Sequence, residues 1–165
     1  MNKCKQDWIE ALQLSAHPEG GYFKETYRST EDHQVLDSGD SRSCGTSIYF
    51  LLGKGDVSHF HKIKSDELWN YHTGDSCVIH VFDTNGIYYQ QVLGTEFDQG
   101  EVLQFIVPAG CVFASESTGD YSLVGCVVVP GFDFQDFKLF TTKELGVEYP
   151  DKMDLIKKFT KEKYG

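Results

Sequence analysis

Residues 53–74 read GKGDVSHFHKIKSDELWNYHTG, and this stretch decides how the rest of the chain is interpreted. His59 and His61 are separated by one residue, and Glu67 follows six positions after His61. Side chains of a strand alternate between its faces, so we expect both imidazoles on one face and Phe60 on the other. Two imidazoles on one face can bind an ion, although such a pair alone is also typical of hydrogen-bonded or exposed histidines.

Length and composition favour one ordered, β-rich domain spanning residues 1–165. Apolar residues make up 40% of the chain and aromatic residues 14%, which is too apolar for a disordered polypeptide. The formal net charge is −10, and the basic cluster of note lies within residues 157–163. Phosphate backbones are bound by broader positive surfaces, so we expect no nucleic-acid partner.

Cysteine content and hydropathy predict a cytoplasmic protein without a membrane partner. The five cysteines are an odd number without a CxxC pair, which argues against a disulfide framework and a cysteine-based zinc site. The first residues include Asp7 and Glu10 and lack the apolar run of a signal peptide. No segment is apolar for long enough to be predicted as a membrane span.

Short β-type runs separated by turns predict a sandwich or barrel. After a first strand at 22–28, the expected strands lie at 46–52, 57–63, 67–72, 77–82, 87–93, 102–107, 111–116, 121–129 and 132–140. Asn85-Gly86 predicts a two-residue type I′ hairpin, in which both central residues have positive φ. The polar, turn-rich residues 29–43 are predicted to form an exposed loop.

Short helices are expected at both ends of a barrel core that spans about 20–140. Apolar residues recur on one helical stripe in a segment at about 5–14, which stops before Pro18. Thr141 and Glu144 have the spacing of a capping box, and Pro150 can open a final helix at about 151–162.

The spacing around the histidine pair belongs to a longer motif. One glycine precedes His59, another follows Glu67, and a later strand ends in PAG at 108–110. These features resemble the two signature motifs of the cupin superfamily, which are small β-barrels of jelly-roll topology, also called double-stranded β-helices. In cupins the first motif commonly supplies two histidines and a glutamate to a metal, and the second a further histidine.

More narrowly, the chain resembles cupin family five, a largely uncharacterised group of about this length. The resemblance rests on HPEGGYFKETYRS, SIYFLL, SHFHKIKSDELWNYHTGD, VPAGCVFASE and SLVGCVVVPGFDFQDFKLF, at 17–29, 47–52, 58–75, 107–116 and 122–140. It implies an all-β cupin barrel. Cupins of this kind commonly pair sheets or exchange an N-terminal strand, so a homodimer is expected in which residues 22–28 add to a neighbour's sheet edge.

Two departures from the general cupin pattern bear on function. The spacer before Glu67 is longer than usual, but alternation favours Glu67 over Asp66 because Glu67 shares a face with Trp69 and Tyr71. The expected histidine of the second motif is replaced by Phe113. The resemblance thus leaves two cases open, no metal or one divalent ion of Fe, Mn, Ni or Zn.

The predicted pocket faces the barrel interior and binds a small organic molecule, with carbohydrates and carbonyl compounds as the candidates. Three functions compete. A metal-free epimerase or isomerase would use His59 or His61 as general base, with Glu67 as its orienting partner and Tyr71 as a second proton carrier. A metal-dependent oxygenase or isomerase would use His59, His61 and Glu67 as ligands. The third is a non-catalytic binding module.

Further ligand contacts are predicted from aromatic and acidic residues near the same face. They are Trp69, Phe113, Tyr49 and Glu19. The segment HPEGGY at 17–22 has two interpretations, a polar cluster at the barrel mouth or a glycine turn that leads into an edge strand. The chain has only two arginines, Arg28 and Arg42, which disfavours a nucleotide-linked sugar as the substrate.

Overall fold

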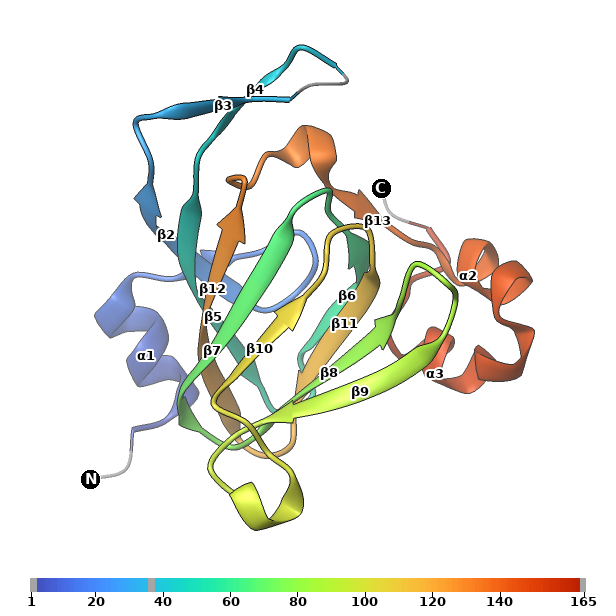
Figure 1. Cartoon of the computed structure of the whole chain (residues 1–165). Helices are drawn as coiled ribbons and strands as arrows, with labels where there is room; N and C mark the ends of the chain where they lie inside the picture. Colours follow the sequence, from blue (N-terminus) through green and yellow to red (C-terminus); the bar gives the residue numbers. More distant parts are fainter. Residues whose placement is uncertain (1–2, 36–37, 164–165) are drawn as a thin grey trace.

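The computed structural model describes residues 3–35 and 38–163 and confirms the predicted all-β class (Figure 1). Two antiparallel sheets form the barrel. The six-stranded sheet has the order β1 (Ser15–Ala16), β2 (Tyr22–Arg28), β5 (Thr46–Gly53), β12 (Tyr121–Val129), β7 (Asp66–Gly74) and β10 (Gln104–Val107). The five-stranded sheet has the order β13 (Lys138–Leu139), β6 (Val57–Lys62), β11 (Val112–Ser117), β8 (Cys77–Phe82) and β9 (Tyr88–Leu93).

The main core lies between the two sheets because alternate residues of the facing strands are apolar. Phe50 and Trp69 come from the six-stranded sheet, Ile79 and Phe113 come from the five-stranded sheet, and each is at most 1% exposed. The rings of Trp69 and Phe113, which come from opposite sheets, meet edge to face with their centroids 6.3 Å apart. This packing favours one arrangement of the two sheets.

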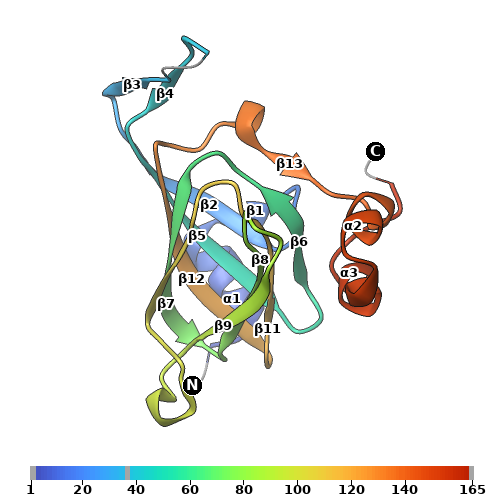
Figure 2. The ribbon, with the colours of Figure 1, turned by 45° about the vertical axis from the view of Figure 1, so that its right-hand side comes forward.

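Helices cover the outer face of each sheet (Figure 2). The first helix, α1 (Lys5–Leu12), packs with Leu51 and Leu123 of the six-stranded sheet. On the five-stranded sheet, Phe60 packs against Ile156 and Phe159 of the C-terminal segment. That segment comprises α2 (Thr142–Glu148), the 3₁₀ turn η3 (Pro150–Lys152) and α3 (Met153–Lys158).

The predicted terminal helices are confirmed with shorter bounds. Thr141 forms the predicted capping box, since its side chain accepts from the Glu144 N–H while the Glu144 side chain accepts from the Thr141 N–H. The final helix stops earlier than predicted, and the Phe159 N–H bonds to carbonyls of the last turn. Phe159 itself is fully buried against the sheet, so the packing of this residue anchors the end of the helix.

Two predicted segments differ from the structure. The loop predicted at 29–43 contains a two-stranded hairpin, β3 (Asp32–Gln34) and β4 (Ser41–Ser43), while residues 36–37 of that loop lie outside the described residues. Both strands are polar, so no apolar alternation marked them. The strand predicted at 132–140 is also wrong. Asp133 caps a 3₁₀ turn, η2 (Phe134–Asp136), and only the two residues of β13 pair as a strand.

The β8–β9 hairpin is confirmed, but its predicted turn type is wrong. Gly86 has φ 81°, whereas Asn85 is not among the residues of positive φ. The Asp83 side chain accepts from the N–H groups of Asn85 and Ile87 at 2.8 Å, and the Gly86 N–H bonds to the Asp83 carbonyl. These bonds stabilise a longer turn with a single left-handed residue.

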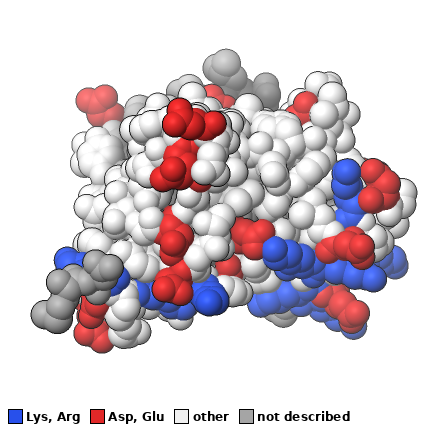
Figure 3. All heavy atoms as spheres, turned by 90° about the horizontal axis from the view of Figure 1, so that it is seen from below, with Lys and Arg blue, Asp and Glu red and all other residues white. Residues whose placement is uncertain are grey.

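The surface agrees with the acidic composition. Seen from below, acidic side chains run in a line across the face, and basic side chains gather mainly along one edge beside further acids (Figure 3). Within residues 3–35 and 38–163, no helix is both long and apolar enough to cross a membrane. The five cysteines are free, and Cys77, Cys111 and Cys126 are buried in the barrel.

Candidate functional site

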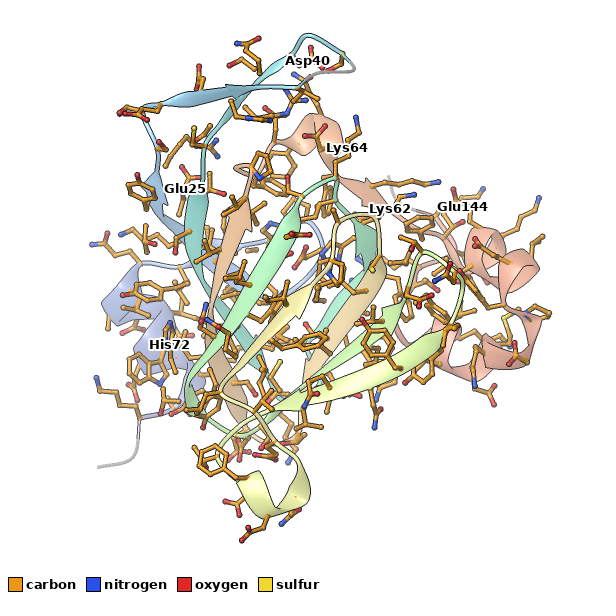
Figure 4. The ribbon with its side chains drawn as sticks, in the orientation of Figure 1. Glu25, Asp40, Lys62, Lys64, His72 and Glu144 are labelled. Atoms are coloured by element: carbon orange, nitrogen blue, oxygen red, sulfur yellow. The ribbon has the colours of Figure 1, made fainter. Side chains whose placement is uncertain are left out.

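A cavity of about 280 Å³ opens at the end of the barrel where β2 ends and β5 begins. Its polar inner wall comprises Glu19, His61, Glu67 and Cys126. Its rim carries aromatic and charged residues of β2 and of the segment that follows β12, and Figure 4 labels one of them, Glu25. The cavity is therefore largely apolar with a few polar groups that converge, as expected of a small-molecule site.

A turn of five residues brings His17 and Glu19 into this cavity. The His17 N–H bonds to the Gly21 carbonyl, and the Gly20 N–H bonds to the His17 carbonyl, both at 3.0 Å. Gly20 and Gly21 have φ of 107° and 73°, a backbone region that residues with a Cβ rarely adopt. A Cβ on Gly20 would also clash with the Val57 carbonyl. The glycine turn and the polar cluster are thus one feature, because the turn places the cluster.

The carboxyl group next to His61 is that of Glu19. Glu19 Oε2 lies 3.1 Å from His61 Nε2, while Ser58 Oγ donates to Glu19 Oε1 at 3.1 Å. His61 is 2% exposed and Glu19 is 7% exposed, so water has little access to either group. The prediction that Glu67 orients the histidine is therefore corrected, since Glu19 makes that contact.

The hydrogen-bond partners determine where the protons lie in this pair. His61 Nδ1 is 2.8 Å from the His59 carbonyl oxygen, which only accepts, so Nδ1 carries the ring proton. Nε2 of the neutral ring is then an acceptor, and Glu19 donates to it in its protonated form. Burial lowers the pKa of His61 to about 3. Burial, and then the neighbouring Glu67 carboxyl, raise the pKa of Glu19 well above its usual value.

His17 belongs to the same cluster and was not predicted. Its Nδ1 accepts from the Glu19 N–H at 3.2 Å and lies 3.6 Å from Glu19 Oε2. Burial lowers the pKa of His17 to about 4, so the ring is neutral near pH 7. The sequence signal was the segment HPEGGY, but its role depends on the turn that folds it back into the barrel.

Glu67 and Cys126 line the cavity from the opposite sheet. Glu67 is the second residue of β7 and Cys126 lies on the neighbouring strand β12, whereas His61 lies on β6 of the other sheet. Burial raises the pKa of Glu67 to about 7, against a smaller opposing effect of its hydrogen bond with Cys126. Two acid groups, Glu19 and Glu67, therefore approach the same cavity from different sides.

His59 does not share a face with His61, contrary to the simple alternation of a strand. The pairing of β6 with β11 shifts between Phe113, which pairs with His61, and Ser115, which pairs with Ser58. Between these two pairs lie two residues of β6, His59 and Phe60, opposite one residue of β11, Ala114, which defines a β-bulge. The bulge places Ser58 on the His61 side, and His59 does not line the cavity. The backbone N–H and Nδ1 of His59 instead bond the Glu19 carbonyl, each at 2.7 Å.

Four other predicted site residues lie outside the cavity lining. Tyr49 packs on the outer face of the six-stranded sheet, where its ring meets His72. The Tyr71 hydroxyl donates to the Gly74 carbonyl at 2.6 Å. Trp69 and Phe113 do point inward, but both are completely enclosed by the core. Asp66, the alternative to Glu67, accepts from the Ala109 N–H.

The proposed metal ligands do not fit a cupin metal centre. His59 is turned to the Glu19 backbone by the bulge, and the Phe113 ring lies 4.1 Å from the His61 ring, at the position where the second motif usually supplies histidine. Among the residues that the structure describes, no group of three or more His, Cys, Asp or Glu side chains is arranged to hold an ion.

The fold and the sequence identify the class of protein. The two-sheet barrel is a cupin fold, as the motifs predicted. The family model Cupin_5, described as "Cupin superfamily (DUF985)", matches residues 6–140. The chain therefore belongs to this cupin family. The uncharacterised protein YML079W of Saccharomyces cerevisiae is similar, with 34% identity over 146 residues that cover 79% of this chain and 72% of that protein.

Solved structures agree with this assignment. A hypothetical protein from Leishmania major superposes with a TM-score of 0.90 at 37% identity, covering 97% of this chain and 100% of that chain. Protein SO0799 from Shewanella oneidensis also has a TM-score of 0.90, at 39% identity, covering 98% and 100%. An oxalate decarboxylase from Lactobacillus farciminis has a TM-score of 0.57 at 12% identity, covers 92% of this chain and 42% of its own, and shares the fold alone.

Proposed function

We propose that the chain binds a small carbonyl compound in the barrel cavity and moves a proton at the carbon next to the carbonyl, as an isomerase or epimerase does. The observation that carries the proposal is the contact between Glu19 and His61, at 3.1 Å, in the wall of the cavity. A carboxyl group and an imidazole that hold one proton between them, shielded from water, are suited to general acid–base chemistry.

The chemistry uses both sides of the cavity. Glu67, in its ionised form, accepts the proton when the C–H bond breaks, and the electron pair forms a carbon–carbon double bond. The carbonyl oxygen receives the proton held by Glu19 and His61, which yields a neutral enol. If the reacting carbon carries a hydroxyl group, return of the Glu67 proton to the former carbonyl carbon gives an isomer while that hydroxyl gives its proton to Glu19. Return of the Glu67 proton to the opposite face of the original carbon, after the enol has turned over, gives an epimer while the enol hydroxyl returns its proton to Glu19. Each step conserves protons and electrons.

The raised pKa of Glu67 supports its part in this scheme. A group whose pKa is about 7 exists in both protonation states near neutral pH, which suits a residue that must accept and return a proton. Glu19 and His61 remain neutral over the same range because burial opposes charge on each of them. One ionisable group thus faces one neutral proton donor across the ligand.

Exchange with heavy water tests the proposal even while the substrate is unidentified. A small-molecule extract is incubated with the protein in D₂O, and mass spectrometry follows deuterium entering carbon positions. We expect a carbonyl compound to gain deuterium with the wild type and not with Glu19→Gln or Glu67→Gln. The matched control is Glu116→Gln, which removes a carboxylate beside a different histidine outside the cavity.

Three results would contradict this proposal. A compound that binds the cavity without deuterium exchange would indicate a non-catalytic binding module. Exchange that required a stoichiometric metal, measured by elemental analysis of protein purified without chelator, would replace proton transfer between side chains with metal-assisted chemistry. Unchanged exchange in Glu19→Gln would remove Glu19 and His61 from the mechanism.

A further inference from the structure

We infer that the rim of the cavity binds an organic ammonium group, so that the ligand carries a positive charge at the end opposite its reacting carbon. This inference rests on the cavity being the ligand site of the proposed function, but it does not require that the ligand is converted. The ammonium group would contact rim residues that are distinct from Glu19, His61 and Glu67.

Aromatic rings surround the rim. Phe23, Phe132 and Phe134 line the cavity together with His17. Phe132 and Phe134 are nearly perpendicular, with centroids 4.9 Å apart, and His17 stands edge-on to Phe23 at 4.6 Å and stacks on Phe134 at 6.3 Å. Rings set at different angles around one space form an aromatic box, which attracts alkylammonium groups through the negative potential of the ring faces.

The charges at the rim also favour a cation. Glu25, Asp133 and Arg28 line the cavity here. The guanidinium of Arg28 donates from Nε and Nη2 to both carboxylate oxygens of Glu25, at 2.9 and 2.7 Å, and from Nη1 to the Phe132 carbonyl at 3.2 Å. Glu25 therefore balances the charge of Arg28, and Asp133 leaves one excess negative charge among these three rim groups.

Asp133 is held where it would meet the ligand. It lies between Phe132 and Phe134 in the chain, and its carboxylate caps the η2 turn by accepting from the Gln135 N–H at 2.8 Å. An anionic ligand group would be repelled by the Asp133 carboxylate. The guanidinium of Arg28 would attract it little, because Glu25 already binds that guanidinium. A cationic group meets ring faces and excess negative charge, so phosphate and carboxylate ligands are disfavoured at the rim.

The wall between rim and polar end is apolar. Ile48, Ile63 and Val128 line it. The structure thus assigns a ligand with an ammonium group at the rim, a short apolar middle and an oxygen-bearing group near Glu19 and His61. Small amino-carbonyl compounds and alkylammonium alcohols have this order of groups.

Three probes of nearly equal shape and different charge test the inference. Choline carries a quaternary ammonium, 3,3-dimethylbutan-1-ol replaces it with a neutral tert-butyl group, and 3,3-dimethylbutanoate is the related anion. Calorimetric titration of the wild type should give choline an affinity roughly 3- to 30-fold above that of the neutral alcohol, the range expected for cation–π contacts. The anion should bind more weakly than both.

Variants of the rim make the test specific. Phe134→Leu keeps apolar volume at a side chain that is 56% exposed, and should remove most of the preference for choline over the neutral alcohol. Asp133→Asn keeps a good helix-capping residue. It should lower the affinity for choline several-fold without changing the affinity for the neutral alcohol. Asp98→Asn, on the exposed 3₁₀ turn η1 (Phe97–Gln99) at the opposite end of the barrel, removes the same charge and should change nothing (Figure 1).

Each other outcome overturns the inference. Equal binding of choline and the alcohol would mean that the rim does not recognise charge. Tightest binding of the anion would mean that Arg28 leaves Glu25 to bind a carboxylate. Failure of all three probes to bind would exclude a ligand of this form. The deuterium-exchange assay reports separately, so catalysis and charge recognition can fail independently.

Discussion

Two histidine–glutamate pairs, an inner pair of His61 with Glu19 and an outer pair of His80 with Glu116, lie in opposite settings. His61 and Glu19 meet at 3.1 Å in the wall of the cavity. His80 and Glu116 meet at 3.4 Å on the outer side of the five-stranded sheet, where the His80 ring lies 4.7 Å from Phe159 beside α3. The residue types and the distances are alike, so the surroundings decide what each pair can do.

The outer pair has a complete set of partners. The Glu116 carboxylate, 3.4 Å from His80 Nε2, can only accept, so Nε2 carries the proton of the neutral ring, and Nδ1 lies 2.8 Å from the Tyr88 hydroxyl. Lys158 Nζ lies 2.6 Å from the Glu116 carboxylate and balances its charge. In the inner pair the proton runs from glutamate to histidine, and a cavity adjoins it. In the outer pair the Lys158 ammonium balances the charge of Glu116, so that pair is structural. The inner pair is neutral and adjoins the cavity, so it is available for chemistry.

The largest expected effect follows from breaking the inner pair. Glu19→Gln should lower the rate of deuterium exchange by roughly 10²- to 10⁴-fold, the usual contribution of a general acid or base. Glutamine can still donate to His61 but has no proton to transfer, so folding should be retained. Glu116→Gln should leave the exchange rate unchanged and lower stability, because it removes the charge that pairs with Lys158. Equal loss of activity in both variants would contradict the distinction.

Removal of a large side chain from the C-terminal segment that packs on the five-stranded sheet should lower stability and leave ligand binding unchanged. Phe159→Ala deletes a fully buried ring that packs against Phe60 and His80, and should reduce the free energy of unfolding by about 3 to 5 kcal/mol. Urea denaturation gives this value. Choline affinity, measured where the variant is folded, should stay within error of the wild type. A large loss of choline affinity would show that the C-terminal segment on the outer face of the sheet shapes the cavity.

The pH dependence of stability should report Glu67. Its folded pKa of about 7 lies above the unfolded value of 4.5, so folding binds the proton more tightly. The cost of burying this group is therefore absent below the unfolded pKa, grows as the pH rises, and is complete above the folded pKa. Glu67→Gln should be more stabilising at about pH 8 than at about pH 5, by about 2 kcal/mol.

His61 contributes with the opposite sign. Its folded pKa of about 3 lies below the unfolded value of 6.5, so its effect on stability rises with pH between these values. The contribution of His61 is present in both the wild type and Glu67→Gln. It therefore cancels from the difference between their free energies of unfolding. Urea denaturation at the two pH values measures that difference, and an equal effect of the substitution at both would contradict the raised pKa.

The smallest expected effect comes from Lys158, the exposed ion-pair partner of Glu116. Lys158→Met removes a half-exposed ammonium from Glu116, and surface ion pairs contribute roughly 0 to 1 kcal/mol. The free energy of unfolding, measured in urea, should fall by less than about 1 kcal/mol at low salt and by less still at high salt. A larger loss, insensitive to salt, would show that Lys158 acts through packing.

The sequence predicted the sheets better than the site. Alternating apolar residues mark most strands, and alternation correctly sent Glu67 inward and Asp66 outward. Alternation failed at His59 because a bulge in β6 adds one residue, and bulges leave no pattern in a short strand. Tyr49 was misplaced for another reason, since strict alternation from Ile48 already puts it on the outer face.

Long-range folding explains what the sequence did not show. His17 and Glu19 reach His61 only because two glycines reverse the chain before β2, and sequence spacing carries no information on which strand such a turn will meet. Nothing in the run of valines around Cys126 marks it as the position that faces the cavity. The rim residues that follow β12 were assigned to a strand, which concealed the η2 turn.

The most direct test of the account is the protonation of His61 itself. In a protein labelled with ¹⁵N at histidine, NMR gives the protonation state of each ring nitrogen, and a His61→Gln variant assigns the signal. The account predicts a neutral ring with the proton on Nδ1 and a hydrogen-bonded Nε2 throughout the range from about pH 5 to about pH 8. A His61 signal that titrates near its ordinary pKa, or a ring doubly protonated at neutral pH, would contradict it.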